Sequence, residues 1–235
     1  MKSFDLDPGL LLAGKYRVEQ RIGAGWEGEV YLVTETATGI ARAAKLFYPH
    51  RNPGNRTVRF HARKLSKLRG CPLLIHYCTQ ETVEYGGRKV TVQVSEYAPG
   101  ELLPSFLKQQ RGGRLHPFEA LHLLHTLVRG IEQIHAMGEY HGDVHMNNIL
   151  VRRVGIGFEL TLLDFFDWGK RTQEHVLDDV CGAIQVFYTV TGGARHYARQ
   201  PDQVKAICRG LKRSLIRQRF RNATRLREYI EQLSW

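Results

Sequence analysis

An aspartate and an asparagine lie five residues apart in the segment His141–Leu150, which reads HGDVHMNNIL. The carboxylate of Asp143 could accept the proton of an attacking hydroxyl, and Asn148 could hold a metal ion beside nucleotide phosphates. Catalytic loops that transfer phosphoryl groups use this spacing. Only three positions of the pattern are fixed, so the same residues could instead cap or turn the backbone. The interpretation therefore depends on other motifs.

A second carboxylate, that of Asp164, directly follows the mostly apolar run Leu160–Leu163. If this strand pairs with the strand after Asn148, the two side chains converge, and their oxygen atoms suit Mg²⁺ or Mn²⁺. Asp167 is the rival ligand, but Asp164 directly follows the apolar strand. We therefore predict a metal site made of Asn148 and Asp164.

A glycine motif lies near the amino end, where Gly23, Gly25 and Gly28 form G-x-G-x-x-G. Glycines allow backbone amides to approach phosphates closely. A dinucleotide-binding motif with this spelling opens a helix, whereas Glu29–Val33 is typical of a strand. The context favours a flexible hairpin over phosphates, and a plain glycine hairpin is the alternative.

Lys45 lies seventeen residues after Gly28, within the strand-like segment Ala43–Phe47. Strand alternation directs its side chain inward, where a lysine without an anionic partner is costly. A bound phosphate would supply that partner. The alternative is a surface lysine on an edge strand.

The elements that must position these residues fall into two parts. Residues 1–97 are strand-rich and residues 98–235 are helix-rich, and they are joined near Glu96–Gly100, where Pro-Gly marks a linker. Hydrophobic periodicity predicts an α+β protein. We expect strands over 16–22, 28–34, 41–47, 74–83, 88–97, 149–153 and 158–163, and helices over 57–68, 117–137, 176–191, 202–213 and 223–233.

The glycine loop, the strand lysine, the HGDVHMNN loop and the LLDFF segment occur in that order over nearly the whole chain. This order resembles the protein-kinase-like superfamily, most closely eukaryotic-type Ser/Thr protein kinases in the amino-terminal part. The resemblance implies a bilobal fold, with a five-stranded antiparallel N-lobe sheet, one N-lobe helix and a reduced, mainly helical C-lobe. Together the two lobes would form one kinase domain.

The resemblance also assigns roles to residues. Asp143, Lys45 and His145 would be catalytic, Glu96 and Ala98 would bind adenine through their backbone, and Glu101 would reach the ribose. Asp179 would support the catalytic loop, although a carboxylate near a helix start is also favoured by the helix dipole. The expected nucleotide-binding residues are Ile22, Gly23, Gly25, Gly28, Val30, Lys45, Glu96, Ala98 and Glu101.

The chain departs from the ordinary kinase pattern at several positions. The predicted helix 57–68 contains no Glu to pair with Lys45, and His61 or Ala62 occupies the expected place. Lys45 must then find another carboxylate or contact Asp164. Phe166 stands where kinases carry a glycine, which reduces backbone freedom.

Two further departures lie around the catalytic loop. Gly142 replaces an arginine that reads a phosphorylated loop, and only fourteen residues separate Asp164 from Asp179. Regulation by loop phosphorylation is therefore not expected. His145 replaces a lysine, and with it the pattern H-G-D-x-H-x-x-N also resembles the loop of aminoglycoside phosphotransferase-like and lipopolysaccharide-sugar kinases. His145 could neutralise the transferring phosphoryl group or make a structural hydrogen bond.

These observations predict a kinase that uses ATP and Mg²⁺ or Mn²⁺ to phosphorylate a hydroxyl, with Ser/Thr of a protein favoured over a small molecule, sugar or lipid. A nucleotide-binding pseudokinase scaffold is the alternative. We expect a cytoplasmic monomer, because no apolar run is long enough to span a membrane and the first residues lack a signal-peptide pattern. The four cysteines form no C-x-x-C pair, and we expect them to be buried apolar residues.

Positive charge is concentrated at the carboxyl end. The net charge is +11, and from Arg195 onward eleven Lys or Arg stand against three acids. Such a region could attract nucleic acid or an anionic membrane surface, or dock an RNA-associated target, but no aromatic-interleaved binding motif accompanies it. We favour a solvated basic face.

Overall fold

The computed structural model describes residues 3–234 and divides the chain into two compact units. The first contains the chain up to Arg69 together with Ile75–Ala98, and the second contains Gly70–Leu74 together with the chain from Pro99 onward. Each unit has its own sheet. The chain therefore enters the second unit briefly before it returns to complete the first.

Backbone pairing explains why Gly70–Leu74 belongs to the second unit. The Leu73 carbonyl accepts a hydrogen bond of 2.7 Å from the Leu162 amide, and Leu74 forms a parallel bridge with Leu162. The prediction of one strand over 74–83 was wrong at its start, because the strand in the first unit covers only Tyr77–Tyr85.

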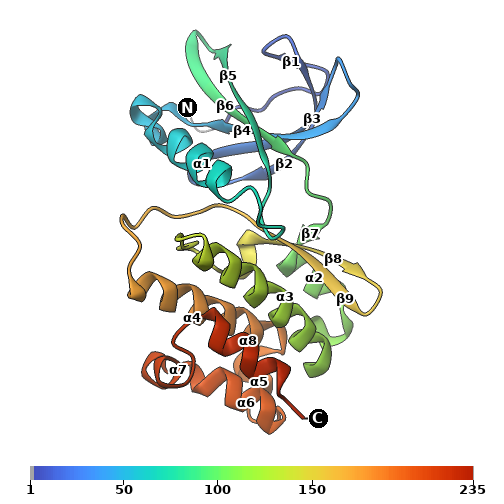
Figure 1. Cartoon of the computed structure of the whole chain (residues 1–235). Helices are drawn as coiled ribbons and strands as arrows, with labels where there is room; N and C mark the ends of the chain where they lie inside the picture. Colours follow the sequence, from blue (N-terminus) through green and yellow to red (C-terminus); the bar gives the residue numbers. More distant parts are fainter. Residues whose placement is uncertain (1–2, 235) are drawn as a thin grey trace. The chain divides into compact units, whose positions relative to one another are not determined.

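The first unit is an antiparallel sheet of six strands with one α-helix (Figure 1). The strand order is β1-β2-β3-β4-β6-β5. The sixth strand, absent from the five-stranded prediction, is the two-residue β1, which pairs with the start of β2. The bounds are β1 Leu11–Leu12, β2 Tyr16–Ala24, β3 Gly28–Glu35, β4 Ala41–Phe47, β5 Tyr77–Tyr85, β6 Arg88–Glu96 and α1 Arg56–Lys67.

Burial along the strands follows their place in this sheet. The edge strand β5 alternates between half-buried and exposed residues, whereas six consecutive residues of β6 are buried. A strand covered on both faces loses the alternation that marks a half-exposed strand. Helix α1 packs against β5 and β6 and buries Val58 and Leu65.

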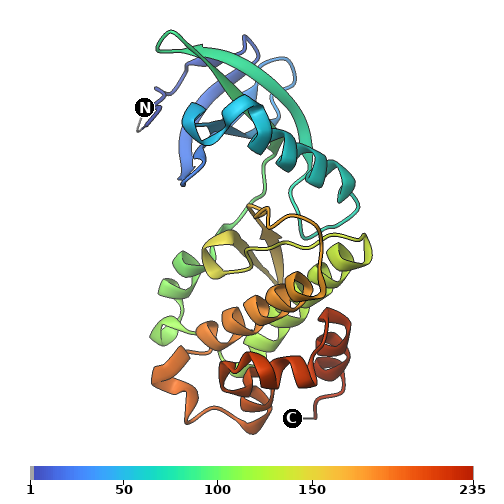
Figure 2. The ribbon, with the colours of Figure 1, turned by 90° about the vertical axis from the view of Figure 1, so that its left-hand side faces the viewer.

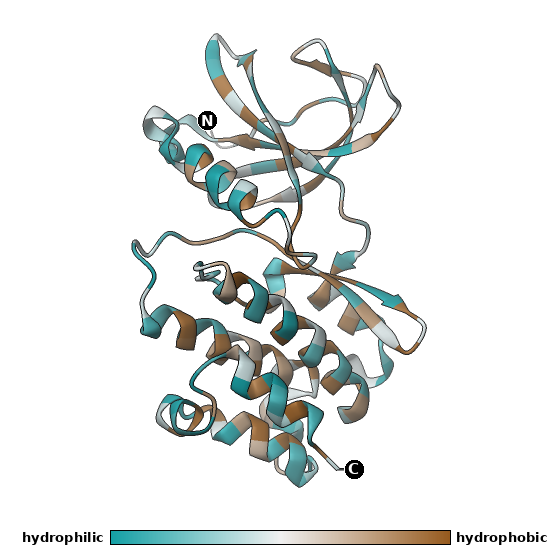
Figure 3. Ribbon diagram, in the orientation of Figure 1, coloured by the Kyte–Doolittle hydropathy of each residue, from teal (hydrophilic) through white to brown (hydrophobic). Residues whose placement is uncertain are grey.

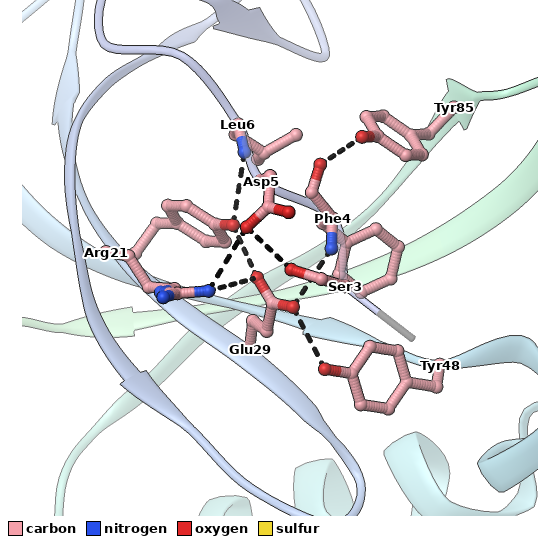
Figure 4. Close-up of polar contacts among 9 residues, drawn as sticks. Ser3, Phe4, Asp5, Leu6, Arg21, Glu29, Tyr48 and Tyr85 are labelled. Carbon is pink, nitrogen blue, oxygen red and sulfur yellow. Dashed lines mark hydrogen bonds and ion pairs between the residues drawn. The ribbon is translucent and has the colours of Figure 1, made fainter. Parts of the chain in front are cut away.

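A buried carboxylate ties the first described residues to the sheet. Glu29 on β3 is 1% exposed and accepts hydrogen bonds from the Phe4 amide at 2.9 Å and the Tyr31 and Tyr48 hydroxyls at 2.5 and 2.9 Å (Figure 4). Arg21 adds an ion pair at 3.8 Å. Burial alone would raise the pKa of Glu29, but these hydrogen bonds outweigh it and hold the pKa below its ordinary value.

The second unit consists of helices and a small antiparallel sheet of order β7-β8-β9. Helix α3 lies against α4 and α8 (Figures 1 and 2), and apolar positions recur along α3 and α4 (Figure 3). The bounds are β7 Glu101–Leu102, β8 Ile149–Val154, β9 Gly157–Leu162, α2 Leu103–Gln109, α3 Pro117–Ala136, α4 Gln173–Val190, α5 Gly193–Tyr197, α6 Asp202–Cys208, α7 Arg213–Arg219 and α8 Ala223–Glu231.

The predicted helix 202–213 was wrong in its second half. Helix α6 ends at Cys208, and a short 3-10 turn at Arg209–Leu211 leads into α7. Arg209, Gly210 and Leu211 all have positive φ, between 50° and 60°. Three successive left-handed residues end a right-handed helix. From Asp202 to Glu231 the chain therefore forms three short α-helices, where the sequence predicted two.

Two expectations from composition can be compared with the structure. Within residues 3–234, no helix is both long and apolar enough to cross a membrane. All four cysteines are free thiols, and Cys71 and Cys208 are buried as expected. Cys78 is exposed, so the expectation of burial was wrong for it.

Candidate active site

The glycine motif forms the turn of the β2–β3 hairpin. Gly23 pairs with Val30, and the Gly25 amide donates a hydrogen bond of 2.9 Å to the Gly28 carbonyl. Gly28 packs so closely on β4 that a Cβ atom there would lie 1.9 Å from the Leu46 carbonyl oxygen. The motif therefore has the strand–turn–strand geometry expected of a hairpin over phosphates, and it opens no helix.

The predicted lysine lies beside this hairpin. Lys45 on β4 pairs with Val30, and its side chain is only 14% exposed, as the strand alternation predicted. Its Nζ atom is 2.7 Å from Oε2 of Glu27. Ile22, near the end of β2, is 41% exposed. The structure thus places Lys45 and the hairpin residues Ile22 and Val30 in one unit, and the Glu27 carboxylate forms an ion pair with the lysine.

Glu27 also contacts helix α1. Nε2 of His61 lies 3.1 and 3.2 Å from the two Glu27 carboxylate oxygens. Burial alone would raise the pKa of Glu27, but the hydrogen bond with His61 and the positive charge of Lys45 lower it to about 2. The carboxylate is therefore ionised at neutral pH.

Glu27 was not predicted as the partner of Lys45. The signal was available in two pieces, since the helix lacks any Glu and the glycine motif carries one in G-A-G-W-E-G. His61, one of the two residues expected at the place of the helix carboxylate, contacts Glu27. Connecting these pieces requires the folded path of the hairpin.

In the second unit, the loop with Asp143 is held by a buried carboxylate. Asp179 on α4 is 1% exposed and accepts hydrogen bonds from the His141 amide at 2.7 Å and the Gly142 amide at 2.8 Å. His135 on α3 lies 2.9 Å from the same carboxylate. Burial alone would raise the pKa of Asp179, but these contacts lower it below its ordinary value. The expected support of the loop by Asp179 is confirmed.

Two of the predicted site residues, Asn148 and His145, contact the carboxylate of Asp143. Nδ2 of Asn148 donates to the Asp143 carboxylate at 2.9 Å and to its backbone carbonyl at 3.0 Å. Nε2 of His145 lies 3.2 Å from the same carboxylate oxygen. Nδ1 of His145 accepts a hydrogen bond from the Asn147 amide, so a neutral ring carries its proton on Nε2 and donates it to Asp143. The Asp143 side chain remains 43% exposed, and a hydroxyl could reach it.

The two predicted metal ligands are brought together by strand pairing. Ile149 pairs with Leu162, and the Leu163 amide donates to the Asn148 carbonyl at 2.7 Å, so Asp164 follows directly beside Asn148. Asp164 has a φ of 47°, a left-handed conformation that is unusual for a residue with a side chain. Such outliers concentrate at functional sites.

The donor set fits a cation that also binds phosphate. Because Nδ2 of Asn148 donates to Asp143, its Oδ1 atom is the one that could bind a cation together with the Asp164 carboxylate. No group of three or more His, Cys, Asp or Glu side chains among residues 3–234 could hold a metal by itself. Mg²⁺ is commonly held by one or two protein side chains together with phosphate oxygens, which matches the Asn148–Asp164 donor set. The rival Asp167 instead accepts a hydrogen bond from the Gly169 amide.

The predicted adenine and ribose contacts lie at the end of β6 and the start of β7. The Glu96 amide donates to the His76 carbonyl at 2.9 Å, and Ala98 lies in the connection that follows. The Glu101 carboxylate accepts a hydrogen bond of 2.6 Å from Gln109 on α2. These positions stay predictions.

The short segment after Asp164 packs back onto the catalytic loop. Nε1 of Trp168 donates to the Gly142 carbonyl at 2.9 Å, and the Trp168 amide donates to the Tyr140 hydroxyl at 2.8 Å. Gly142 has a φ of 86°, and a Cβ atom on it would lie 2.8 Å from the Phe166 carbonyl oxygen. An arginine at this position would thus be strained, which explains why the chain has glycine here.

Comparisons with known proteins agree with this geometry. The protein kinase domain family matches residues 16–187. The serine/threonine-protein kinase pkn2 of Myxococcus xanthus is 32% identical over 161 residues, which are 66% of this chain and 18% of the relative. The serine/threonine-protein kinase PknA of Mycobacterium tuberculosis is 29% identical over 163 residues, 67% of this chain and 36% of the relative. The match therefore spans less than half the length of each of these relatives.

Solved structures share the fold. The PknI kinase domain of Mycobacterium tuberculosis superposes with a TM-score of 0.66 at 17% identity, covering 97% of this chain and 98% of that one. A single-site variant of that domain gives 0.68 at 19% identity, with the same coverage. The N-lobe sheet and helical C-lobe of the prediction are confirmed. With the family match over 172 residues, 16–187, the chain belongs to the protein kinase domain family.

Proposed function

We propose that this chain is an ATP-dependent protein kinase that transfers the γ-phosphoryl group of ATP to a serine or threonine hydroxyl. The observation that carries the proposal is the arrangement at Asp143. Its carboxylate is positioned by Asn148, contacted by His145 and still partly exposed, on a loop anchored by the buried Asp179. A positioned carboxylate that a hydroxyl can reach is what this reaction requires.

The proposed reaction is an in-line displacement. The acceptor oxygen forms a bond to the γ-phosphorus, the bond from that phosphorus to the β,γ-bridging oxygen breaks, and ADP leaves. The acceptor proton passes to the Asp143 carboxylate. Lys45 and the backbone amides of the β2–β3 hairpin would hold the phosphates. Mg²⁺ or Mn²⁺, held by Asn148 and Asp164, would neutralise charge on the phosphate oxygens.

His145 has two roles open to it within this proposal. Its contact with Asp143 supports a positioning role, in which the Nε2 proton keeps the carboxylate oriented. Its ring is 43% exposed, so it could also face the transferring phosphoryl group and, when protonated, neutralise its charge.

A protein acceptor is favoured by the relatives, since pkn2 and PknA are both named as serine/threonine-protein kinases. A small-molecule acceptor is the second candidate. One observation favours it, namely that the short segment 165–178 leaves little chain to bind a peptide.

A cytoplasmic location is also part of the proposal, because the reaction needs ATP, which is available there.

The test uses purified protein with γ-labelled ATP, Mg²⁺ and a generic protein acceptor. We expect label transfer or slow ATP hydrolysis that falls about 10²-fold or more in Asp143→Asn and in Lys45→Ala. Asp202→Asn, an exposed acid at the start of α6, is the matched control and should keep wild-type turnover.

Equal label transfer by the wild type and both site variants would contradict the proposal. Stabilisation by ATP that survives in Asp143→Asn, with no turnover in any variant, would indicate a nucleotide-binding pseudokinase. Transfer to small hydroxyl compounds but to no protein would move the proposal to its second candidate.

A further inference from the structure

Helix α1 offers Lys45 no carboxylate. The helix contains arginine, lysine and histidine but neither Asp nor Glu, whereas kinases pair this lysine with a glutamate of that helix. A buried ammonium that must bind phosphates needs an anionic group to hold it in place. Something else in the fold must therefore position Lys45, and this inference rests on the proposed function.

The Glu27 carboxylate lies between the lysine and the helix. Its Oε2 atom is 2.7 Å from Lys45 Nζ and 3.1 Å from His61 Nε2, so one oxygen contacts both β4 and α1. His61 is only 4% exposed, and it is one of the two α1 residues expected where a kinase helix carries its glutamate. The negative charge is thus on the helix side of the lysine, although it comes from the hairpin.

The backbone around Glu27 is fixed as well. The Glu27 carbonyl accepts a hydrogen bond of 2.9 Å from the Tyr48 amide. The neighbouring Trp26 ring is covered by the Arg51 guanidinium at 3.8 Å from the ring centroid. Both contacts join the hairpin to the segment between β4 and α1. The main chain at Glu27 is therefore held in place on both counts, which limits where its carboxylate can lie, as a positioning group requires.

We propose that Glu27 is the positioning residue for Lys45. It replaces the missing helix carboxylate, and through His61 it couples the phosphate-covering hairpin to helix α1. A movement of the hairpin would then move the lysine, because the Glu27 carboxylate belongs to the hairpin and holds Lys45. In this kinase the hairpin would set the catalytic lysine as well as cover the phosphates.

The test is a rescue experiment in two variants. Glu27→Gln keeps the shape and removes the charge, and we expect kcat to fall about 10²-fold while the ATP dissociation constant changes by less than about threefold, because misplaced phosphates react slowly even when bound. The double variant Glu27→Gln/His61→Glu moves the carboxylate onto the helix, and its kcat should be at least about tenfold higher than that of Glu27→Gln. Glu84→Gln, an exposed acid on β5, is the matched control.

A second measurement does not depend on turnover. Lys45 is labelled in the nucleotide-free protein with an amine-acetylating reagent and quantified by mass spectrometry. With one anionic partner fewer, a buried amine loses its proton more easily and reacts faster, so labelling should rise in Glu27→Gln and return toward the wild-type rate in the double variant. Melting temperatures of all variants identify any that fail to fold.

The outcomes separate the inference from the proposed function. If the wild type turns over ATP and Glu27→Gln matches it in kcat and labelling, the inference is overturned and the function stands. Tighter ATP binding with undiminished kcat in Glu27→Gln would also overturn it, because Glu27 would then shield the lysine from phosphate. If the wild type has no turnover, the proposed function fails, and the labelling alone decides whether Glu27 holds Lys45.

Discussion

At the scale of single residues, the charge on Glu27 makes stability depend on pH. Its pKa is lowered from 4.5 to about 2 in the folded protein, so the ionised carboxylate stabilises the fold. That contribution is complete well above pH 4.5 and is lost as the pH falls from about 4.5 toward 2. We expect Glu27→Gln to lower the free energy of unfolding at pH 7, and the difference from wild type to shrink through this range. Urea unfolding at several pH values measures it, and a difference that is constant with pH would contradict the assignment.

The two aspartates after β9 can be separated by their metal dependence. Asp164 follows the strand directly and lies beside Asn148, whereas Asp167 caps a turn at Gly169. We expect Asp164→Asn to raise the Mg²⁺ concentration needed for half-maximal ATP turnover at least about tenfold. Asp167→Asn should leave it near the wild-type value. A titration with Mg²⁺ decides, and the reverse order would make Asp167 the ligand.

At this scale the sequence predicted the residues whose chemistry is local. Asp143 and Asn148 share one short loop, and the structure joins them by a direct hydrogen bond. Glu27 was not predicted because its role comes from a lysine on another strand and a histidine on a helix. No spacing rule relates those three positions.

At the scale of elements, the β2–β3 hairpin depends on one glycine much more than on another. A Cβ at Gly28 would lie 1.9 Å from the Leu46 carbonyl, whereas a Cβ at Gly25 would meet no atom within 4 Å. We expect Gly28→Ala to lower the free energy of unfolding by about 1–3 kcal/mol, because β3 and β4 must separate. Gly25→Ala should change it by less than about 1 kcal/mol. Urea unfolding of both variants measures this, and equal effects would contradict the packing argument.

The sequence predicted most elements but not the break near the carboxyl end. Periodicity over 202–213 indicated one helix, and only Gly210 argued against it. A glycine within a helix costs about 1 kcal/mol, which is too little to predict a break by itself. The left-handed residues Arg209 and Leu211 carry side chains, so no sequence rule marks them as a turn. The two-residue β1 escaped prediction because it is too short to show alternation.

At the scale of the whole molecule, the Glu29 cluster lies entirely within the first unit. Glu29→Gln would leave buried hydroxyls of Tyr31 and Tyr48 without their charged acceptor, which costs about 1–3 kcal/mol. We expect amide hydrogen exchange to accelerate in β2, β3 and residues 4–6 and to stay unchanged in α3 and α4. Mass spectrometry of both units in one sample makes the comparison, with Glu84→Gln as control. Equal acceleration in α3 would show that the units open together.

The net charge of +11 is also a property of the whole molecule, and part of its basic end is neutralised locally. Arg213 and Arg217 form ion pairs with Glu174, and Arg227 contacts Glu132 and Glu231. The Glu174 pairs join α7 to α4, and the Arg227–Glu132 pair joins α8 to α3, whereas Arg227–Glu231 lies within α8. Three of the eleven basic residues that the sequence presented as a possible binding face thus take part in contacts between helices.

The return of the chain through Gly70–Leu74 bears on how this protein can be divided or recombined. A cut at Ala98 would separate the second unit from Gly70–Leu74, whose Leu73 carbonyl accepts a hydrogen bond from the β9 strand. Neither half is a continuous stretch, so exchanging one half with that of a relative would replace part of the other. We therefore expect the two units to be exchanged between relatives only together. A truncated form that keeps only the residues after Ala98 would lack Gly70–Leu74, which belong to the second unit.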